Sequence, residues 1–281
     1  GIERVGKVLM PLLFILMLVL IVRGLMLPGA MEGVKFLFRP DPEAFTGEAL
    51  LNAMGFAFFS LSVGSGSMMN YGSYLSERVS VGPSTAWIVL LAVLASILGG
   101  LMIMPAVFAF GLAPDAGPGL TFATMPAVFG RMPFGDLFAV AFYACLFVAA
   151  LTSSISILEM SAQHFVDRWG FSRRAAVLMV SSVLGVVGVF CALSFGPLAD
   201  VKFFGRTLFE LLDYATSNIG MPIGCLGLSA VSCFVAWRTT KTQLSANASW
   251  SPAMLTAFRF FAGVLAPIVI LIVAAKGIGL I

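Results

Sequence analysis

The segment 58–67 constrains the fold of this chain more than any other. It is apolar enough to lie in a membrane, but its middle holds glycines at 64 and 66 and serines at 62 and 65, where a spanning helix should be most regular. Each glycine in a helix interior costs about 1 kcal/mol relative to alanine, and unpaired backbone groups in hydrocarbon are costlier still. The pattern predicts a discontinuous helix whose break faces protein or a wet cavity, a device that builds ion and small-molecule sites near the bilayer midplane.

The composition places the whole chain in a membrane. Of its 281 residues, 60% are hydrophobic and only 10% are charged, against about 25% charged residues in soluble domains. We expect an all-α membrane protein in which residues 1–281 form a single transmembrane domain. The net charge of +3 is spread out without a basic run, which argues against nucleic acid as a partner. The cysteines lie in apolar runs without a metal-binding spacing and are predicted to be packing residues: Cys145, Cys191, Cys225 and Cys233.

Hydrophobic runs of about 20 residues or more predict seven transmembrane helices. Their expected ranges are 5–27, 47–77, 84–112, 134–167, 173–196, 206–237 and 252–276, with the interruption in the second. The apolar piece 120–129 is too short to cross and fits an interfacial or re-entrant helix.

The positive charges predict the orientation of these spans. Nine of the 16 Lys and Arg residues fall on the face that holds residues 1–7, and seven fall on the other, which weakly favours the first face as cytoplasmic. We expect a multi-pass protein of the cell inner (plasma) membrane. Because residues 1–7 read as a cytoplasmic approach to a span, we also expect the sequence to continue a longer protein.

Three residues on the fourth predicted span could bind a cation. Ala149, Thr152 and Ser153 stand at i, i+3 and i+4, so they share one helix face. Two hydroxyls and a carbonyl with a spare lone pair are hard, nearly neutral donors, which suit a monovalent cation better than calcium or magnesium. The alternative is that the hydroxyls bond back to carbonyls of the preceding turn, as Ser and Thr usually do in membrane helices.

Acidic residues inside the predicted spans are further candidates, because intramembrane carboxylates are costly and often functional. Asp213, near the start of the sixth span, is either functional or simply interfacial. Glu159 lies deeper and must be paired or protonated, although the sequence does not identify its partner. His164 has no second ligand-type residue nearby, so no metal site is expected there. The sequence offers no nucleophile–base set, and we do not expect an enzyme.

Four motifs along the chain, taken together, resemble a known family. They are GIER at 1–4 with Lys7 and Pro11, FFSLSVGSG at 58–66 followed by YGSY at 71–74, AALTSSI at 149–155, and LLDYATSN at 211–218. They look like parts of spans five, six, eight and ten of the neurotransmitter:sodium symporters, bacterial branch. The resemblance implies the inverted-repeat fold of the leucine-transporter type, present here as a partial domain of spans five to eleven without spans one to four.

The resemblance also implies ligands for the transported ion and substrate. Ala149, Thr152 and Ser153 match the second sodium site, and Ser60 matches a hydroxyl of the first. The positions that match the substrate pocket lie on the interrupted span and on the fourth predicted span: Phe59, Ser62, Ser65, Ser153 and Ile157. The backbone of Ser62 would face the substrate amine, because the unwound helix frees carbonyls.

The gates can be matched in the same way. Asp213 matches the acid of the extracellular gate, Asp167 the acid of the cytoplasmic gate, and Tyr74 a tyrosine of the cytoplasmic gate. The arginines that pair with both acids would belong to the absent span one.

Several residues depart from the family pattern. Ala92 stands where an Asn or Asp usually completes the first sodium site, and Phe56 stands where many members have a glutamine. These departures put the first sodium site and any chloride dependence in doubt, and Ser96, at the position of a chloride-site serine, carries little weight alone. Ser65 replaces a bulky apolar residue, which would enlarge the pocket or make it more polar.

The implied function is sodium-coupled symport of an amino acid or related small amine by alternating access. Its partners would be sodium, the substrate, the lipid bilayer and the missing N-terminal spans. The alternative is a non-transporting membrane fragment of a truncated transporter gene, at most a packing partner for another protein.

Overall fold

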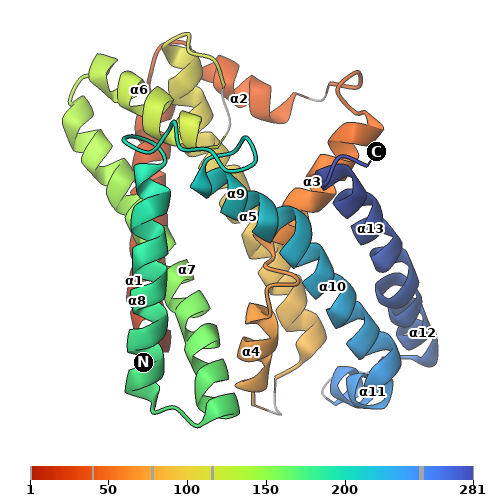
Figure 1. Ribbon diagram of the computed structural model, residues 1–281. Coiled ribbons are helices and arrows are strands. Elements are labelled where there is room, and N and C mark those ends of the chain that lie inside the picture. The colour runs from red at the N-terminus through yellow and green to blue at the C-terminus, as the bar shows by residue number, and fades with distance from the viewer. Residues whose placement is uncertain (1, 40, 77–78, 115–116, 247–249, 281) are drawn as a thin grey trace. The chain divides into compact units, whose positions relative to one another are not determined.

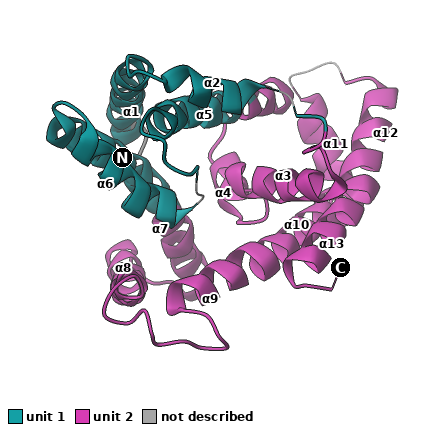
Figure 2. Ribbon diagram, turned by 90° about the horizontal axis from the view of Figure 1, so that it is seen from above, with its two compact units in different colours: residues 1–42, 90–156 teal, residues 43–89, 157–281 magenta. Residues whose placement is uncertain are grey.

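The computed structural model describes residues 2–39, 41–76, 79–114, 117–246 and 250–280, and over these ranges it is built from helices (Figure 1). The chain divides into two compact units, residues 1–42 with 90–156 and residues 43–89 with 157–281 (Figure 2). Two long helices, α5 (Val81–Ala109) and α7 (Gly135–Trp169), contribute to both units. Each unit is described by itself.

The first unit contains α1 (Ile2–Leu25), α2 (Ala30–Phe38), the π-helical segment η1 (Leu120–Thr124) and α6 (Met125–Arg131), together with most of α5 and α7. Its core is formed by buried side chains of α1, α5, α6 and α7, among which Val107, Val128 and Phe142 are fully buried. A Cβ atom at Gly33 would lie 2.4 Å from the carbonyl oxygen of Met104. Glycine is therefore required where α2 crosses α5.

The second unit contains the remaining elements. They are α3 (Gly47–Ser60), α4 (Ser67–Ser73), α8 (Arg173–Leu193), α9 (Leu208–Tyr214), η2 (Ala215–Gly220), α10 (Met221–Ala230), η3 (Val231–Val235), α11 (Trp237–Ser245), α12 (Pro252–Phe260), η4 (Phe261–Leu265) and α13 (Ala266–Gly277). Two runs in it are continuous: α9 to η3, and α12 to α13. The start of the first run is set by a capping box, in which Thr207 and Glu210 each accept a hydrogen bond from the other's backbone amide.

Six helices or helical runs among the described residues are long and apolar enough to cross a membrane: Arg4–Leu25, Val81–Ala109, Gly135–Trp169, Arg173–Leu193, Leu208–Val235 and Pro252–Gly277. They match six of the seven predicted spans to within about three residues. The second predicted span, 47–77, differs because it consists of two short helices, α3 and α4, with no helix over 61–66. Its last predicted position, residue 77, lies outside the described residues. The predicted short piece 120–129 is helical as η1 and α6 and ends at Arg131.

Side-chain donors connect the π-helical segments η3 and η4. The guanidinium of Arg259 donates from Nε to the carbonyl of Cys233 at 3.0 Å, and the hydroxyl of Ser229 donates to the carbonyl of Ala262 at 2.5 Å. The segments are in close contact, since a Cβ atom at Gly263 would lie 3.0 Å from that of Cys233. Each segment thus offers a carbonyl to a donor from the other helical run.

Candidate functional site

The break between α3 and α4 is a turn made of left-handed residues. Ser62, Gly64 and Gly66 have φ values of 52°, 89° and 84°. Glycine adopts this conformation without a penalty, whereas Ser62 does so at a cost of about 1–2 kcal/mol. The helical hydrogen-bond ladder ends here, with the amide of Val63 donating to the carbonyl of Phe58 at 3.0 Å. The sequence prediction of a break at these glycines and serines is confirmed.

The serines of the break bond to one another and to its backbone. The hydroxyl of Ser65 donates to the carbonyl of Ser62 at 2.9 Å, and the hydroxyls of Ser65 and Ser67 share a further hydrogen bond. A carbonyl oxygen has two lone pairs, so this contact leaves Ser62 one lone pair for a ligand. Ser65 is exposed and Ser67 is buried, so the polar side of the break is accessible at Ser65.

The other side of the break packs directly on α10. A Cβ atom at Gly224 would lie 1.9 Å from the carbonyl oxygen of Gly64, and one at Gly64 would lie 2.4 Å from the carbonyl oxygen of Met221. The buried thiol of Cys225 donates to the carbonyl of Val63, with sulfur and oxygen 3.1 Å apart. Two glycines and a thiol thereby hold the backbone of the break against one helix. Cys225 was predicted only to be a packing residue, and the structure adds this hydrogen bond.

The predicted cation ligands lie on one face of α7. The hydroxyl of Thr152 donates to the carbonyl of Ala149 at 2.8 Å, so two of the predicted oxygens are already adjacent. Ser154 likewise donates to the carbonyl of Ala150 at 2.8 Å, so the back-bonding that the sequence left open does occur on this helix. Ser153 is exposed. The donor set is neutral and oxygen-only, which fits a hard monovalent cation; the ligand role remains a prediction.

The other predicted ligand positions are on the surface of the second unit. Ser60 is the last residue of α3 and is exposed. Phe59 is 57% exposed and lines a small cavity of about 50 Å³ together with Pro222 and Cys225. Ile157 is 49% exposed on α7, one turn beyond the predicted cation ligands.

The predicted gate residues are also exposed. Asp213 accepts a hydrogen bond from the hydroxyl of Ser217 at 3.2 Å, and Asp167 accepts one from Nε2 of Gln163 at 2.7 Å. Tyr74 follows the last residue of α4 and is 58% exposed. Each acid therefore has one neutral partner, from the helical turn before or after it.

The predicted site residues fall in both compact units. Ala149, Thr152 and Ser153 belong to the first unit. The remainder belong to the second: Phe59, Ser60, Ser62, Ser65, Tyr74, Ile157, Asp167 and Asp213. The structure thus brings together the residues of the break and, separately, those of the α7 face.

The partner that Glu159 requires is Arg173. Nη2 of Arg173 lies 2.8 and 2.7 Å from the two carboxylate oxygens, and the Glu159 side chain is only 12% exposed. The pair joins α7 to the first residue of α8. Glu159 lies ten residues, nearly three turns, before the end of α7, so spacing along the sequence did not identify Arg173 as its partner. His164 packs its ring against Phe165 and Trp169.

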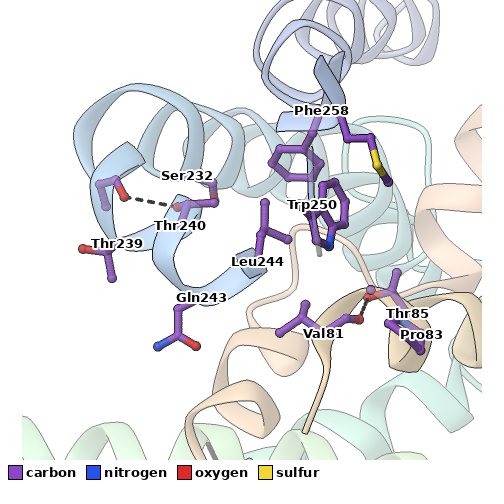
Figure 3. Close-up of a pocket in the computed structure, with 13 residues that line it drawn as sticks. Val81, Pro83, Thr85, Ser232, Thr239, Thr240, Gln243, Leu244, Trp250 and Phe258 are labelled. Atoms are coloured by element: carbon purple, nitrogen blue, oxygen red, sulfur yellow. Dashed lines mark hydrogen bonds between the residues drawn. The ribbon is translucent and has the colours of Figure 1, made fainter. Parts of the chain in front are cut away.

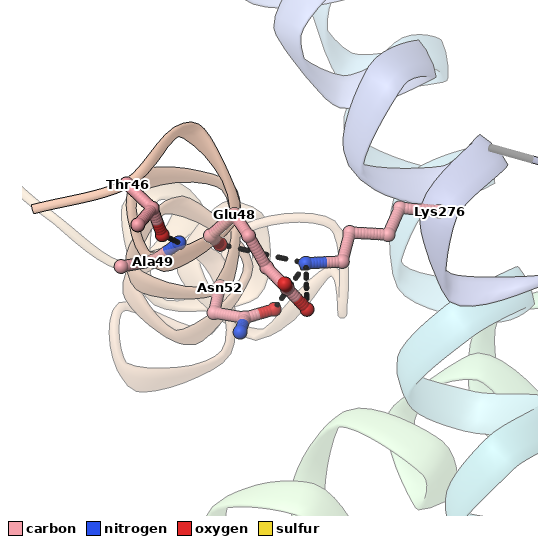
Figure 4. A network of polar contacts seen from close by, with 5 residues as sticks. All are labelled: Thr46, Glu48, Ala49, Asn52 and Lys276. Carbon is pink, nitrogen blue, oxygen red and sulfur yellow. Dashed lines mark hydrogen bonds and ion pairs between the residues drawn. The ribbon is translucent and has the colours of Figure 1, made fainter. Parts of the chain in front are cut away.

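A lysine network that the sequence did not reveal joins α13 to the start of α3 (Figure 4). Nζ of Lys276 lies 3.1 Å from Oε1 of Glu48, 3.4 Å from the Glu48 carbonyl and 3.1 Å from Oδ1 of Asn52. The lysine side chain is 25% exposed. The residues are more than 220 positions apart, so spacing gave no indication of the contact.

The second unit also contains a groove of about 880 Å³ between the start of α5, α11 and α12 (Figure 3). Apolar side chains such as Leu244, Trp250 and Phe258 line it, with uncharged polar groups from Ser232 and Gln243. None of its described lining residues is ionisable. We assign it no role.

Comparisons with known proteins identify the family of this chain. Residues 1–279 match the profile described as the sodium:neurotransmitter symporter family. The "uncharacterized sodium-dependent transporter YhdH" of Bacillus subtilis is 42% identical over 248 residues, and an uncharacterized sodium-dependent transporter of Haemophilus influenzae is 35% identical over 248 residues. Each alignment covers 88% of this chain and 54% of the relative. The chain thus spans about half the length of these curated relatives.

A solved structure shares the fold. The crystal structure of MhsT in complex with L-phenylalanine matches 99% of this chain and 63% of its own, with 34% identity and a TM-score of 0.85. The chain therefore belongs to the sodium:neurotransmitter symporter family, as the motifs predicted. This is a family of transporters, so the expectation that the chain is not an enzyme is confirmed.

Proposed function

We propose that the protein containing this chain is a sodium-coupled symporter of an amino acid or related small amine. Family membership and the sodium-dependent relatives support the coupling ion. The substrate class is supported by the relative MhsT, whose structure holds L-phenylalanine. The observation that carries the proposal is the break over 61–66, which frees backbone carbonyls that a continuous helix would use in its own hydrogen bonds.

The proposed mechanism is alternating access within an inverted-repeat fold. We propose that α3 and α4 together form a discontinuous seventh span, so that the chain contributes spans five to eleven of such a fold. Sodium and substrate would jointly stabilise an occluded state that then opens inward. Each ligand can shift this equilibrium only by its difference in affinity between the two states.

The proposed second sodium site consists of the Ala149 carbonyl, Thr152 and Ser153. Their support is the shared face of α7 and the neutral, oxygen-only donor set. Ser60 is the proposed hydroxyl of a first sodium site, although Ala92 removes a donor from that site. We propose sodium as the coupling ion.

The proposed substrate-binding residues are Phe59, Ser62, Ser65, Ser153 and Ile157. The backbone of Ser62 would receive the substrate amine. Ser65, whose hydroxyl is exposed, would make the pocket more polar than a bulky apolar residue does.

We propose that Asp213, Asp167 and Tyr74 act as gate residues, closing the pocket toward the outside and the cytoplasm. A charge pair across a closing gap favours the closed state, so each acid would bias the conformational equilibrium. The face bearing Arg4 and Lys7 is proposed to be cytoplasmic in the inner (plasma) membrane.

The test is reconstitution of two proteins into vesicles with an imposed inward sodium gradient. The first is the 281-residue chain alone, and the second is the product of the complete reading frame that contains it. We expect gradient-driven amino-acid uptake only by the second, because the absent spans would complete the sodium shells and the substrate contacts. Uptake by the chain alone contradicts the need for further spans. Absence of sodium-dependent uptake in both, over all natural amino acids, contradicts the proposed function.

A further inference from the structure

Two arginines line one cavity in the first unit. The cavity has a volume of about 380 Å³ and lies among the end of α1, the residues around the end of α5, and the turn that follows α6. Arg23 and Arg131 contribute its only ionisable side chains among the described lining residues, and the walls include Met26, Leu27 and Phe110. The cavity is independent of the proposed transport site.

In the part of the chain that the structure describes, neither guanidinium forms an ion pair with a carboxylate. Among the described residues, no Asp or Glu lies within 4.0 Å of either arginine, and the acid on the neighbouring helix α2, Glu32, is engaged with Lys35 at 2.7 Å. Arg23 lies over the ring of Phe138 with its Cζ 5.4 Å from the centroid, and Arg131 makes one long contact of 3.5 Å from Nη1 to a backbone carbonyl. These contacts satisfy only part of the donor capacity of two guanidinium groups.

The surrounding helix ends reduce the positive charge but do not cancel it. The C-termini of α1, α5 and α6, near residues 25, 109 and 131, each carry a partial charge of up to about −0.5. Two guanidinium groups carry +2 together, so the cavity remains positive. An open, positive cavity is therefore expected to attract an anion.

The chemistry of the lining identifies the class of anion. The guanidinium group presents a planar fork of donors that matches a phosphate oxyanion. Arg23 lies in the last turn of α1, a helix long enough to cross the membrane, so the cavity lies near the level at which lipid headgroups lie. The apolar wall suits the glycerol and first methylenes of a lipid. We propose that this cavity binds a phosphate group, supplied by an anionic phospholipid or by free phosphate.

The test measures phosphate-dependent binding to the protein from the complete reading frame, purified in mild detergent. Native mass spectrometry compares phosphatidylglycerol with phosphatidylcholine, and a parallel arm adds inorganic phosphate as competitor. The variants are Arg23→Gln, Arg131→Gln, their double variant and the charge-conserving double substitution to Lys. Arg206→Gln is the matched control, because this arginine lies over the Tyr214 ring, in the other unit.

We expect the parent to prefer phosphatidylglycerol, and the double Gln variant to lose that preference by about tenfold or more, since charged hydrogen bonds are lost. The double Lys variant should retain charge and bind at an intermediate level, and it keeps the test valid if the Gln variant does not fold. Arg206→Gln should bind like the parent. Competition by inorganic phosphate at millimolar concentration supports a free-phosphate source, and its failure supports a lipid source. An unchanged lipid preference in both double variants overturns the proposal.

Discussion

Replacing Gly224 by alanine tests how closely the break must approach α10. The new Cβ atom would lie 1.9 Å from the carbonyl oxygen of Gly64, whereas an ordinary contact begins at 3.4 Å, so the break would have to move by 1.5 Å. Overpacking of this kind costs about 1–3 kcal/mol. Gly227→Ala is the matched control, because it lies on the same helix and its Cβ atom would meet nothing within 4 Å. Alanine there should stabilise the helix by about 0.5–1 kcal/mol.

The measurement is thermal unfolding together with sodium-dependent substrate binding, for both variants in the protein from the complete reading frame. Both substitutions gain the same helix propensity, so the difference between them reports the contact with the break. We expect Gly224→Ala to unfold with about 1–3 kcal/mol less stability than Gly227→Ala. Because the break carries the proposed substrate contacts, substrate affinity should fall by about tenfold for each 1.4 kcal/mol lost at the site. Equal stability and equal affinity of the two variants would refute the reasoning.

Three further substitutions test other parts of the structure. The double variant Thr152→Val with Ser153→Ala should lower sodium affinity by about tenfold or more. An unchanged sodium dependence of uptake would show that neither residue is a sodium ligand. Asp213→Asn should slow substrate uptake while sodium binding stays near the parental level, and the accessibility of an engineered cysteine reports whether the outer vestibule opens. If uptake and cysteine accessibility both equal those of the parent, Asp213 is an interfacial residue and not a gate. Lys276→Met should accelerate hydrogen exchange at the start of α3 and lower stability by up to about 1 kcal/mol, whereas Lys35→Met should leave α3 unaffected.

The sequence predicted the spans and the break because both depend on local properties. Long apolar runs define helices that cross a bilayer, and the glycines and serines over 62–66 mark the interruption, whereas Gly99 and Gly100 lie inside the continuous helix α5. The six continuous spans therefore agree with the structure to within about three residues. The end of the interrupted span was less predictable. Its second helix, α4, ends at Ser73, and the polar and glycine residues there leave no clear edge of an apolar run.

The partners of the site could not be predicted, because they come from distant parts of the chain. Cys225 reaches the carbonyl of Val63 across 162 positions, and its apolar surroundings indicated only a packing role. Glu159 was recognised as needing a partner, but choosing Arg173 among several nearby arginines required the fold. The π-helical segments were not predicted either, since their residues have ordinary helix propensities and their extra turn width arises from packing.

The hydrogen bonds that Arg259 and Ser229 donate to the carbonyls of η3 and η4 also affect the order in which this part of the protein forms during synthesis. The carbonyl of Cys233 is synthesised 26 residues before the guanidinium of Arg259 that donates to it. The chain turns at Ala236, with φ −108° and ψ 26°, so the last carbonyls of η3 cannot continue a helical ladder. A carbonyl without a donor in hydrocarbon costs several kcal/mol. The run from α9 to η3 therefore gains this hydrogen bond only after Arg259 has been synthesised and the run from α12 to α13 has inserted beside it.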